Sequence, residues 1–300
     1  MFDEPLIVSG MRSSGKSALI PLLKCFSDFY FDLKSFHFGQ YCQLESTGIL
    51  DRDVATALFR YHADFRYYDL KIGRGINIRL DDETSLWNFN EPSEMFKRIN
   101  MPRGELALCE GKPGFDLKII DIHNGLSHID FLLHVFSGMR LINLSRSGVS
   151  TVFSWVRDRI WAQDSLKKPL SQVLVFEHHG ALVPIVAREW ADEFLCLSLA
   201  DRSVEMYRRQ LSADLKGKSF LEQHGIDYLD IGFEDLLVNP RAIVLQIEQF
   251  LRHPHNAYLN RVLKKEGLPR DFSQEDLIKK FEILKPQLST KNSNFLHDMI

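Results

Sequence analysis

The stretch from Leu6 to Leu22 constrains the fold more than any other part of the chain, because it reads as a strand, a polar loop and a helix. The apolar run 6–8 predicts a buried strand, and the apolar run that begins at Ala18 predicts a helix. Between them, Gly10 and Gly15 permit the backbone angles that turn successive N–H groups toward one anion at the start of the helix. We therefore predict an oxyanion site here, for phosphate or sulfate.

Polar side chains of the loop add charge and donors to this predicted site. Arg12 and Lys16 supply positive charge, while Ser14 and Ser17 supply hydroxyl groups. The residues 10–17 also satisfy the full Gly-x-x-x-x-Gly-Lys-Ser pattern of the P-loop found in nucleotide triphosphatases. The loop therefore predicts a ligand that carries phosphate.

The composition excludes some classes of partner. The chain has 300 residues, 45% of them hydrophobic and 26% charged, which is enough to bury a full core. Its 37 basic and 40 acidic residues give a net charge of −3, so no overall field attracts nucleic acid. We expect no nucleic-acid partner, and any anion site must be local.

Cysteine usage and hydropathy favour a cytoplasmic protein. The first residues enter the predicted strand at once, without a charged-then-apolar leader, and no apolar stretch approaches the ~20 residues of a transmembrane helix. We expect reduced thiols, no structural zinc and no transmembrane segment, because no Cys-x-x-Cys pair is present. The four scattered cysteines are Cys25, Cys42, Cys109 and Cys196.

Beyond the loop, short apolar runs alternate with amphipathic stretches, as in α/β folds with buried parallel strands. The strand-like runs lie at 106–109, 117–122, 139–144 and 227–231. The helical stretches lie at about 127–136, 149–161, 184–215 and 241–251, and a polar tail follows at 289–294. We predict a three-layer α/β fold with a central, mainly parallel sheet. Since no internal repeat or linker is present, we expect a single domain over 1–300.

Residues 28–105 differ in character from the rest of the chain. They are rich in aromatic residues and histidine, and they carry the charged stretch 74–83. Most of these aromatic side chains fit core-facing helix stripes. A long aromatic segment beside an anion loop is also a place where an acceptor pocket can be built. We therefore interpret 28–105 as an acceptor-side insertion in the domain.

Two further groups fall at predicted strand ends. Arg146 follows the run 139–144, and Ser154 comes eight positions later on the next helix, so both side chains can reach one anion above the sheet edge. His123 directly follows the run 117–122, at the same edge as the loop if the strands are parallel. A histidine there can act as a general base on a hydroxyl group, because its ordinary pKa is near physiological pH.

In these motifs the chain resembles the sulfotransferases that use 3′-phosphoadenosine 5′-phosphosulfate (PAPS). The run 8–15 resembles the 5′-phosphosulfate loop of the family, and Arg146 and Ser154 match the Arg and Ser of its 3′-phosphate motif at the same separation. His123 is similar in placement to the catalytic His of the cytosolic branch. The run Phe-Glu-Asp-Leu-Leu-Val-Asn-Pro at 233–240 resembles a pattern near the family's C-terminus.

The chain also departs from the family pattern at four positions. The family usually has a cation where this chain has Ser13, and Thr where it has Lys16. The cytosolic branch of the family has Trp where this chain has Ala18, and Lys where it has Asp121. The cation that supports the transferring group is thus displaced, and Arg12 or Lys16 takes its place in this interpretation.

The resemblance implies a PAPS-dependent enzyme that sulfates a hydroxyl group of a carbohydrate, lipid or small metabolite. His123 would take the acceptor proton, Lys16 and Arg12 would stabilise the transferring group, and Arg146 with Ser154 would grip the 3′-phosphate. No metal is expected, and the product of the donor is adenosine 3′,5′-bisphosphate. The loop residues that would bind the cofactor are Arg12, Ser13, Ser14, Gly15, Lys16 and Ser17.

Two alternatives come from the same loop. A kinase or nucleotide triphosphatase would use Mg-ATP, with Lys16 on the β- and γ-phosphates and Ser17 on Mg²⁺. Such an enzyme needs a second acidic metal partner at a strand end, for which Asp121 and Glu110 are candidates. The other alternative is a nucleotide-binding module without catalytic activity.

Overall fold

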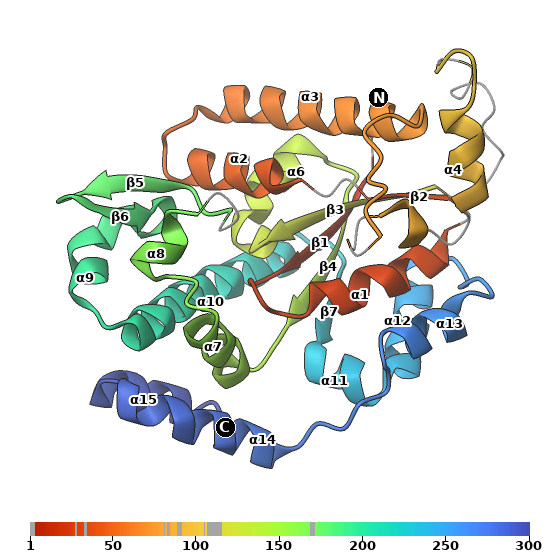
Figure 1. Cartoon of the computed structure of the whole chain (residues 1–300). Helices are drawn as coiled ribbons and strands as arrows, with labels where there is room; N and C mark the ends of the chain where they lie inside the picture. The colour runs from red at the N-terminus through yellow and green to blue at the C-terminus, as the bar shows by residue number, and fades with distance from the viewer. Residues whose placement is uncertain are drawn as a thin grey trace.

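The centre of the molecule is a sheet of five parallel strands in the order β2, β3, β1, β4, β7 (Figure 1). The strands are β1 (Leu6–Gly10), β2 (Phe29–Asp32), β3 (Asp116–His123), β4 (Arg140–Ser145) and β7 (Tyr228–Gly232). Every residue of β1 is buried, as in the middle strand of a parallel sheet that is covered on both faces. The predicted α/β fold with a parallel sheet is confirmed.

The computed structural model describes residues 4–27, 29–32, 35–80, 82, 85–88, 92–104, 106, 116–168 and 172–300. The predicted strand at 106–109 lies mostly outside these residues, and so do Cys109 and Glu110. Three cysteines that are described, Cys25, Cys42 and Cys196, are free thiols. Among the described helices, none has both the length and the apolar character needed to cross a membrane.

Helices cover both faces of the sheet, because alternate residues of β1 point to opposite sides. One layer packs on Leu6 and Val8 and consists of α1 (Lys16–Leu23), α12 (Pro240–Leu251) and α13 (Leu259–Lys265). The other layer packs on Ile7 and includes α2 (Phe36–Ser46), α3 (Arg52–Lys71) and α6 (Ile129–Val135). The predicted three-layer arrangement is therefore the observed one.

A third buried cluster joins helices and a hairpin that follow β4 in the chain. Its members come mainly from α7 (Gly148–Arg157), α8 (Gln163–Leu166), β6 (Ala181–Pro184), the 3-10 helix η5 (Ile185–Trp190), α9 (Ala191–Cys196), α10 (Leu199–Gln223), α14 (Gln274–Leu284) and α15 (Thr290–His297). The other elements are α4 (Pro92–Ile99), β5 (Val175–His178), α11 (Phe233–Val238) and the 3-10 helices η1 (Lys24–Phe26), η2 (Leu86–Asn88), η3 (Gly125–His128) and η6 (Lys285–Gln287).

The long helical region predicted over about 184–215 is confirmed only in part, because the structure divides it into η5, α9 and α10. Pro184 ends the β5–β6 hairpin, and η5 and α9 precede a break before α10. Ser198 then caps α10, its hydroxyl oxygen accepting a hydrogen bond from the Asp201 N–H at 3.1 Å. A capping serine begins a new helix, and this signal marks the division.

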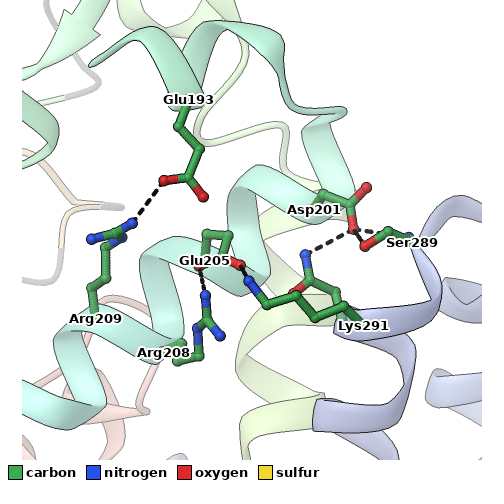
Figure 2. Close-up of polar contacts among 8 residues, drawn as sticks. Glu193, Asp201, Glu205, Arg208, Arg209, Ser289 and Lys291 are labelled. Atoms are coloured by element: carbon green, nitrogen blue, oxygen red, sulfur yellow. Dashed lines mark hydrogen bonds and ion pairs between the residues drawn. The ribbon is translucent and has the colours of Figure 1, made fainter. Parts of the chain in front are cut away.

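The polar tail predicted at 289–294 is also wrong, because this segment begins α15, which packs on α10 (Figure 2). Asp201 of α10 accepts hydrogen bonds from the Ser289 N–H at 2.9 Å, the Ser289 hydroxyl at 2.8 Å and the Asn292 amide at 2.9 Å. Glu205, one turn later, accepts from Lys291 at 3.1 Å and from Arg208. Tertiary hydrogen bonds, rather than an apolar stripe, order this polar sequence.

We expect Asp201→Ala to lower the free energy of unfolding by about 2 to 4 kcal/mol, because it leaves the buried Asn292 amide and the Ser289 N–H without their acceptor. Urea denaturation measures this loss. Glu193→Ala is the control, since its exposed ion pair with Arg209, at 2.9 Å (Figure 2), should contribute less than about 1 kcal/mol. Equal losses in the two variants would contradict a role for Asp201 in holding α15.

The same prediction has a pH dependence. Burial opposes ionisation of Asp201, but the hydrogen bonds from Ser289 and Asn292 together outweigh it and hold its pKa below the usual value. A carboxyl group with a lowered folded-state pKa stabilises the protein above its unfolded-state pKa of about 4, and this stabilisation is lost as the pH falls through the folded-state pKa. The difference between wild type and Asp201→Ala should therefore shrink in acid.

Candidate functional site

The predicted anion loop is a tight turn between β1 and α1. The Ser14 N–H donates to the Met11 carbonyl at 3.1 Å, and both Ser13 and Gly15 have left-handed backbone angles, with φ of 64° and 96°. A Cβ atom on Gly15 would lie 2.2 Å from the ring of Phe233. Only glycine satisfies both the backbone angle and this close approach.

Lys16 turns back into the loop and reaches the end of β3. Its Nζ donates to the Gly10 carbonyl at 2.7 Å and to His123 Nδ1 at 2.8 Å, and it lies 3.8 Å from the Asp121 carboxylate. The side chain is only 5% exposed. Burial lowers the pKa of Lys16, against the opposing effect of Asp121. The loop thus holds a desolvated cation beside a histidine.

His123 is the last residue of β3 and pairs in register with Gly10. Because β1 and β3 are parallel, this register places the histidine at the same sheet edge as the loop, as the sequence predicted. An ammonium group only donates hydrogen bonds, so with Lys16 protonated Nδ1 accepts and the ring proton lies on Nε2. Nδ1 can therefore take up a proton only after Lys16 has turned to another partner.

The other loop side chains differ in exposure. The Ser14 hydroxyl is buried and has no hydrogen-bond partner among the described residues. Arg12 is partly buried, and burial lowers the pKa of its guanidinium. The Arg12 carbonyl accepts a hydrogen bond from Trp155 Nε1 at 3.0 Å, which ties the loop to α7. Ser17 is exposed at the first turn of α1.

Arg146 lies directly after β4 and contacts the outside of the loop. Its Nη1 donates to the Ser13 carbonyl at 2.6 Å, and its guanidinium lies over the Phe233 ring at 5.1 Å. Burial lowers the pKa of Arg146, against the effect of Glu234, whose carboxylate accepts from the Ser147 N–H at 3.1 Å. The Phe233 ring therefore packs between Arg146 and Gly15.

Ser154 lies on α7 and bonds within that helix, its hydroxyl donating to the Ser150 carbonyl at 2.9 Å. In the described structure Arg146 and Ser154 make no hydrogen bond to each other. A third residue near Arg146, Lys280 of α14, was not predicted from the sequence. Its Nζ donates to the Ser150 hydroxyl at 3.1 Å, and its pKa is lowered by burial and by the positive charge of Arg146. No sequence pattern predicts this contact, since Lys280 and Ser150 are 130 residues apart.

A cavity of about 60 Å³ lies between the loop, the end of β4 and α10. Two buried oxygens in its lining, Ser14 Oγ and Asn143 Oδ1, have no hydrogen-bond partner among the described residues. Asp214 also lines it, and burial raises the pKa of this carboxyl group to about 6. The cavity therefore offers polar groups that a hydrogen-bonding ligand or water would satisfy.

A second cavity, of about 40 Å³, lies between the end of β3 and α2. Asp121 and His123 form one wall. The first turns of α2 form another wall with Phe36, Gly39, Gln40 and Gln43, and Ser35 and Gln172 complete the lining. Part of the segment 28–105 thus faces the histidine at the sheet edge.

Asp121, the described candidate for a metal partner, has its carboxylate 3.8 Å from Lys16 Nζ. Within the described ranges, the three His, Cys, Asp or Glu side chains that converge lie on the β5–β6 hairpin and α9. The described side chains that bring positive charge to the loop are Lys16 and Arg12, and Arg146 bonds the Ser13 carbonyl.

No protein-family model and no curated protein sequence matches this chain. In structure, the chain is similar to several solved sulfotransferases. Sulfotransferase STF9 from Mycobacterium avium is 13% identical with a TM-score of 0.45, over 96% of this chain and 77% of that chain. Sulfotransferase STF1 from Mycobacterium tuberculosis H37Rv is 12% identical with a TM-score of 0.43, over 96% and 76%. The sulfotransferase domain from the curacin biosynthetic pathway is 13% identical with a TM-score of 0.44, over 98% and 96%. Similarities this distant leave the assignment of function to the site itself.

Proposed function

We propose that this protein is a PAPS-dependent sulfotransferase that acts on a hydroxyl group of a carbohydrate, lipid or small metabolite. The observation that carries the proposal is a pair of cations that bond two different carbonyl groups of one loop. Lys16 donates to the Gly10 carbonyl, and Arg146 donates to the Ser13 carbonyl. Two separate cationic positions suit a nucleotide with anionic groups at both its 5′ and 3′ positions.

The loop fits the 5′ end of such a donor. The Ser14 hydroxyl is a buried group that needs a partner, Lys16 supplies a desolvated positive charge, and Arg12 and Ser17 border the same turn. A bound PAPS molecule supplies the sulfuryl group for transfer. In this proposal the backbone N–H groups and Lys16 stabilise charge on its oxygens, which is the main task of a protein in such displacements.

His123 serves as the base in this proposal. When Lys16 turns from Nδ1 toward the donor, the lone pair on that nitrogen becomes available to accept the proton of the acceptor hydroxyl group. The cavity between His123 and α2 is the position that we assign to the reacting hydroxyl group of the acceptor, since its lining offers glutamine amides and the Ser35 hydroxyl for hydrogen bonds. This assignment gives the segment 28–105 its role as the acceptor side of the domain.

Arg146 and Ser154 hold the 3′-phosphate in this proposal, and Lys280 adds to them. We expect Lys280→Ala to weaken binding of adenosine 3′,5′-bisphosphate by about 10-fold to 100-fold, because a charge-assisted hydrogen bond to an anion contributes about 1.5 to 3 kcal/mol. Calorimetric titration measures this change. Lys279→Ala is the matched control, since Lys279 is exposed on the same helix and its ion-pair partner is Glu275, at 4.0 Å. Equal affinities in the two variants would exclude Lys280 from the anion site.

The experiment that tests the proposed function compares two nucleotides by calorimetry. We expect adenosine 3′,5′-bisphosphate to bind without metal, and ATP with Mg²⁺ to bind more weakly. A preference for Mg-ATP would contradict the proposal and favour a kinase or nucleotide triphosphatase in which Asp121 and Ser17 serve the metal. Bisphosphate binding without sulfuryl transfer from PAPS to any of a panel of sugars, lipids and phenols would favour the non-catalytic module.

A further inference from the structure

Two histidines and one aspartate converge at the tip of the β5–β6 hairpin, which lies at the edge of the molecule beside α9 (Figure 1). His178 is the last residue of β5 and pairs with Ala181 across the turn. The two turn residues, His179 and Gly180, have positive φ of 50° and 75°, as in a two-residue type I′ turn. This turn fixes the two imidazole rings next to each other, with their centroids 4.2 Å apart.

Asp192, near the start of α9, brings a carboxylate to the two rings. Its Oδ1 lies 2.7 Å from His178 Nε2 and 3.4 Å from His179 Nε2, and the three ligand atoms all lie within 4.8 Å of one another. We propose that His178, His179 and Asp192 form a binding site for a divalent transition metal ion, with Zn²⁺ as the ion that the ligands suit best.

The distances support this proposal. Tetrahedral Zn²⁺ holds nitrogen and oxygen ligands at about 2.0 to 2.2 Å, which places ligand atoms about 3.3 to 3.5 Å from each other. The separation of His179 Nε2 and the Asp192 carboxylate, 3.4 Å, already has this value. The 2.7 Å hydrogen bond between His178 and Asp192 has to open by roughly 0.6 Å. Asp192 is 80% exposed, so the carboxylate is free of packing that would resist this shift.

The chemistry of the three side chains also supports it. Imidazole nitrogens and a carboxylate oxygen are ordinary Zn²⁺ ligands, and three protein ligands leave one position for water. The site is open to solvent, since His179 is 74% exposed and His178 is 30% exposed. Because the ligands come from the hairpin and from α9, a bound ion adds a link between two elements that already pack together in the third buried cluster. This function is separate from the nucleotide site and does not depend on it.

The test is a titration of tag-free, chelator-treated protein with Zn²⁺, measured by calorimetry and by competition with a chromogenic chelator. We expect one Zn²⁺ per chain, and an affinity at least tenfold weaker in each of His178→Ala, His179→Ala and Asp192→Asn. Urea denaturation without metal shows whether the variants fold as the wild type does, which we expect because these side chains lie at the surface. The absorption spectrum of bound Co²⁺ reports whether nitrogen and oxygen ligands surround the ion.

Two control variants make the outcome decisive. His255→Ala removes a histidine that bonds a carboxylate, Glu248, at 2.6 Å without a second imidazole, and it should leave Zn²⁺ affinity unchanged. Cys196→Ser removes the free, exposed thiol at the end of α9, and it should also leave the affinity unchanged. The proposal is overturned by the absence of stoichiometric binding, by an equal loss in His255→Ala, or by ligand variants that bind as tightly as the wild type. Loss of binding in Cys196→Ser would overturn the assigned set of three ligands.

Discussion

Replacement of His123 by alanine should reduce sulfuryl transfer by about 100-fold to 10,000-fold, the usual contribution of a positioned general base. Binding of adenosine 3′,5′-bisphosphate should stay within about threefold of wild type, because a base that acts on the acceptor does not hold the donor product. Steady-state rates with PAPS and an accepted hydroxyl compound, together with calorimetry, measure the two quantities.

His134→Ala serves as the control for this prediction, since His134 is exposed near the end of α6. It should leave both rate and affinity unchanged. An active His123→Ala variant would show that the assignment of the base is wrong. A variant that loses nucleotide binding as well as turnover would show instead that His123 acts through its bond to Lys16, at 2.8 Å, by positioning that cation.

Lys16→Met should lower both nucleotide affinity and turnover, with a loss of turnover of about 100-fold or more, because it removes the charge closest to the transferring group. Its effect on stability should be small, because two contributions oppose each other. Burial lowers the pKa of Lys16, so the charged form is disfavoured in the folded protein at any pH below the ordinary lysine pKa. Methionine has similar volume and carries no charge to desolvate.

The same substitution leaves the Gly10 carbonyl and His123 Nδ1 without this donor, which offsets the relief of desolvation. The unfolding free energy of Lys16→Met, measured with urea at neutral pH, should therefore stay close to that of the wild type. Lys24→Met is the comparison variant, since Lys24 is also buried but lies beyond α1, away from the loop. It should leave nucleotide affinity and turnover unchanged. A destabilised Lys16→Met variant with normal nucleotide affinity would mean that Lys16 has a structural role and that the loop binds anions without it.

The elements that position the loop could be predicted from the sequence because their signals are local. An apolar run followed by Gly10 and Gly15 specifies a strand and a turn, and the parallel sheet then brings His123 beside Gly10. Contacts between segments that are far apart in the sequence have no local pattern that predicts them. Phe233 belongs to the pattern at 233–240, which identifies no contact by itself. The packing of Phe233 on Gly15 and under Arg146 depends on the order of strands β1, β4 and β7.

The errors in the sequence analysis have similar causes. The region 184–215 has helical periodicity on both sides of Ser198, and the cap rather than the apolar pattern divides it. The segment 289–294 lacks an apolar stripe, and it becomes helical where Asp201 and Glu205 of α10 accept its hydrogen bonds. Lys280 reaches Ser150 of α7 because α14 packs there, and the residues next to Lys280 in the sequence do not predict this contact.

The central claim, that Arg146 recognises a 3′-phosphate, is tested most directly by a cycle that removes the residue and the phosphate in turn. Adenosine 3′,5′-bisphosphate and adenosine 5′-monophosphate are titrated into wild type and Arg146→Ala, with Arg157→Ala as the control because Arg157 is exposed and pairs with Asp158 at 2.8 Å. The proposal predicts a coupling free energy of about 1.5 to 3 kcal/mol between Arg146 and the 3′-phosphate, and a much smaller one for Arg157, whose charge acts on Arg146 only from a distance. A coupling near zero for Arg146, with both nucleotides weakened equally, would contradict the claim and remove the main reason to regard this loop as a PAPS site.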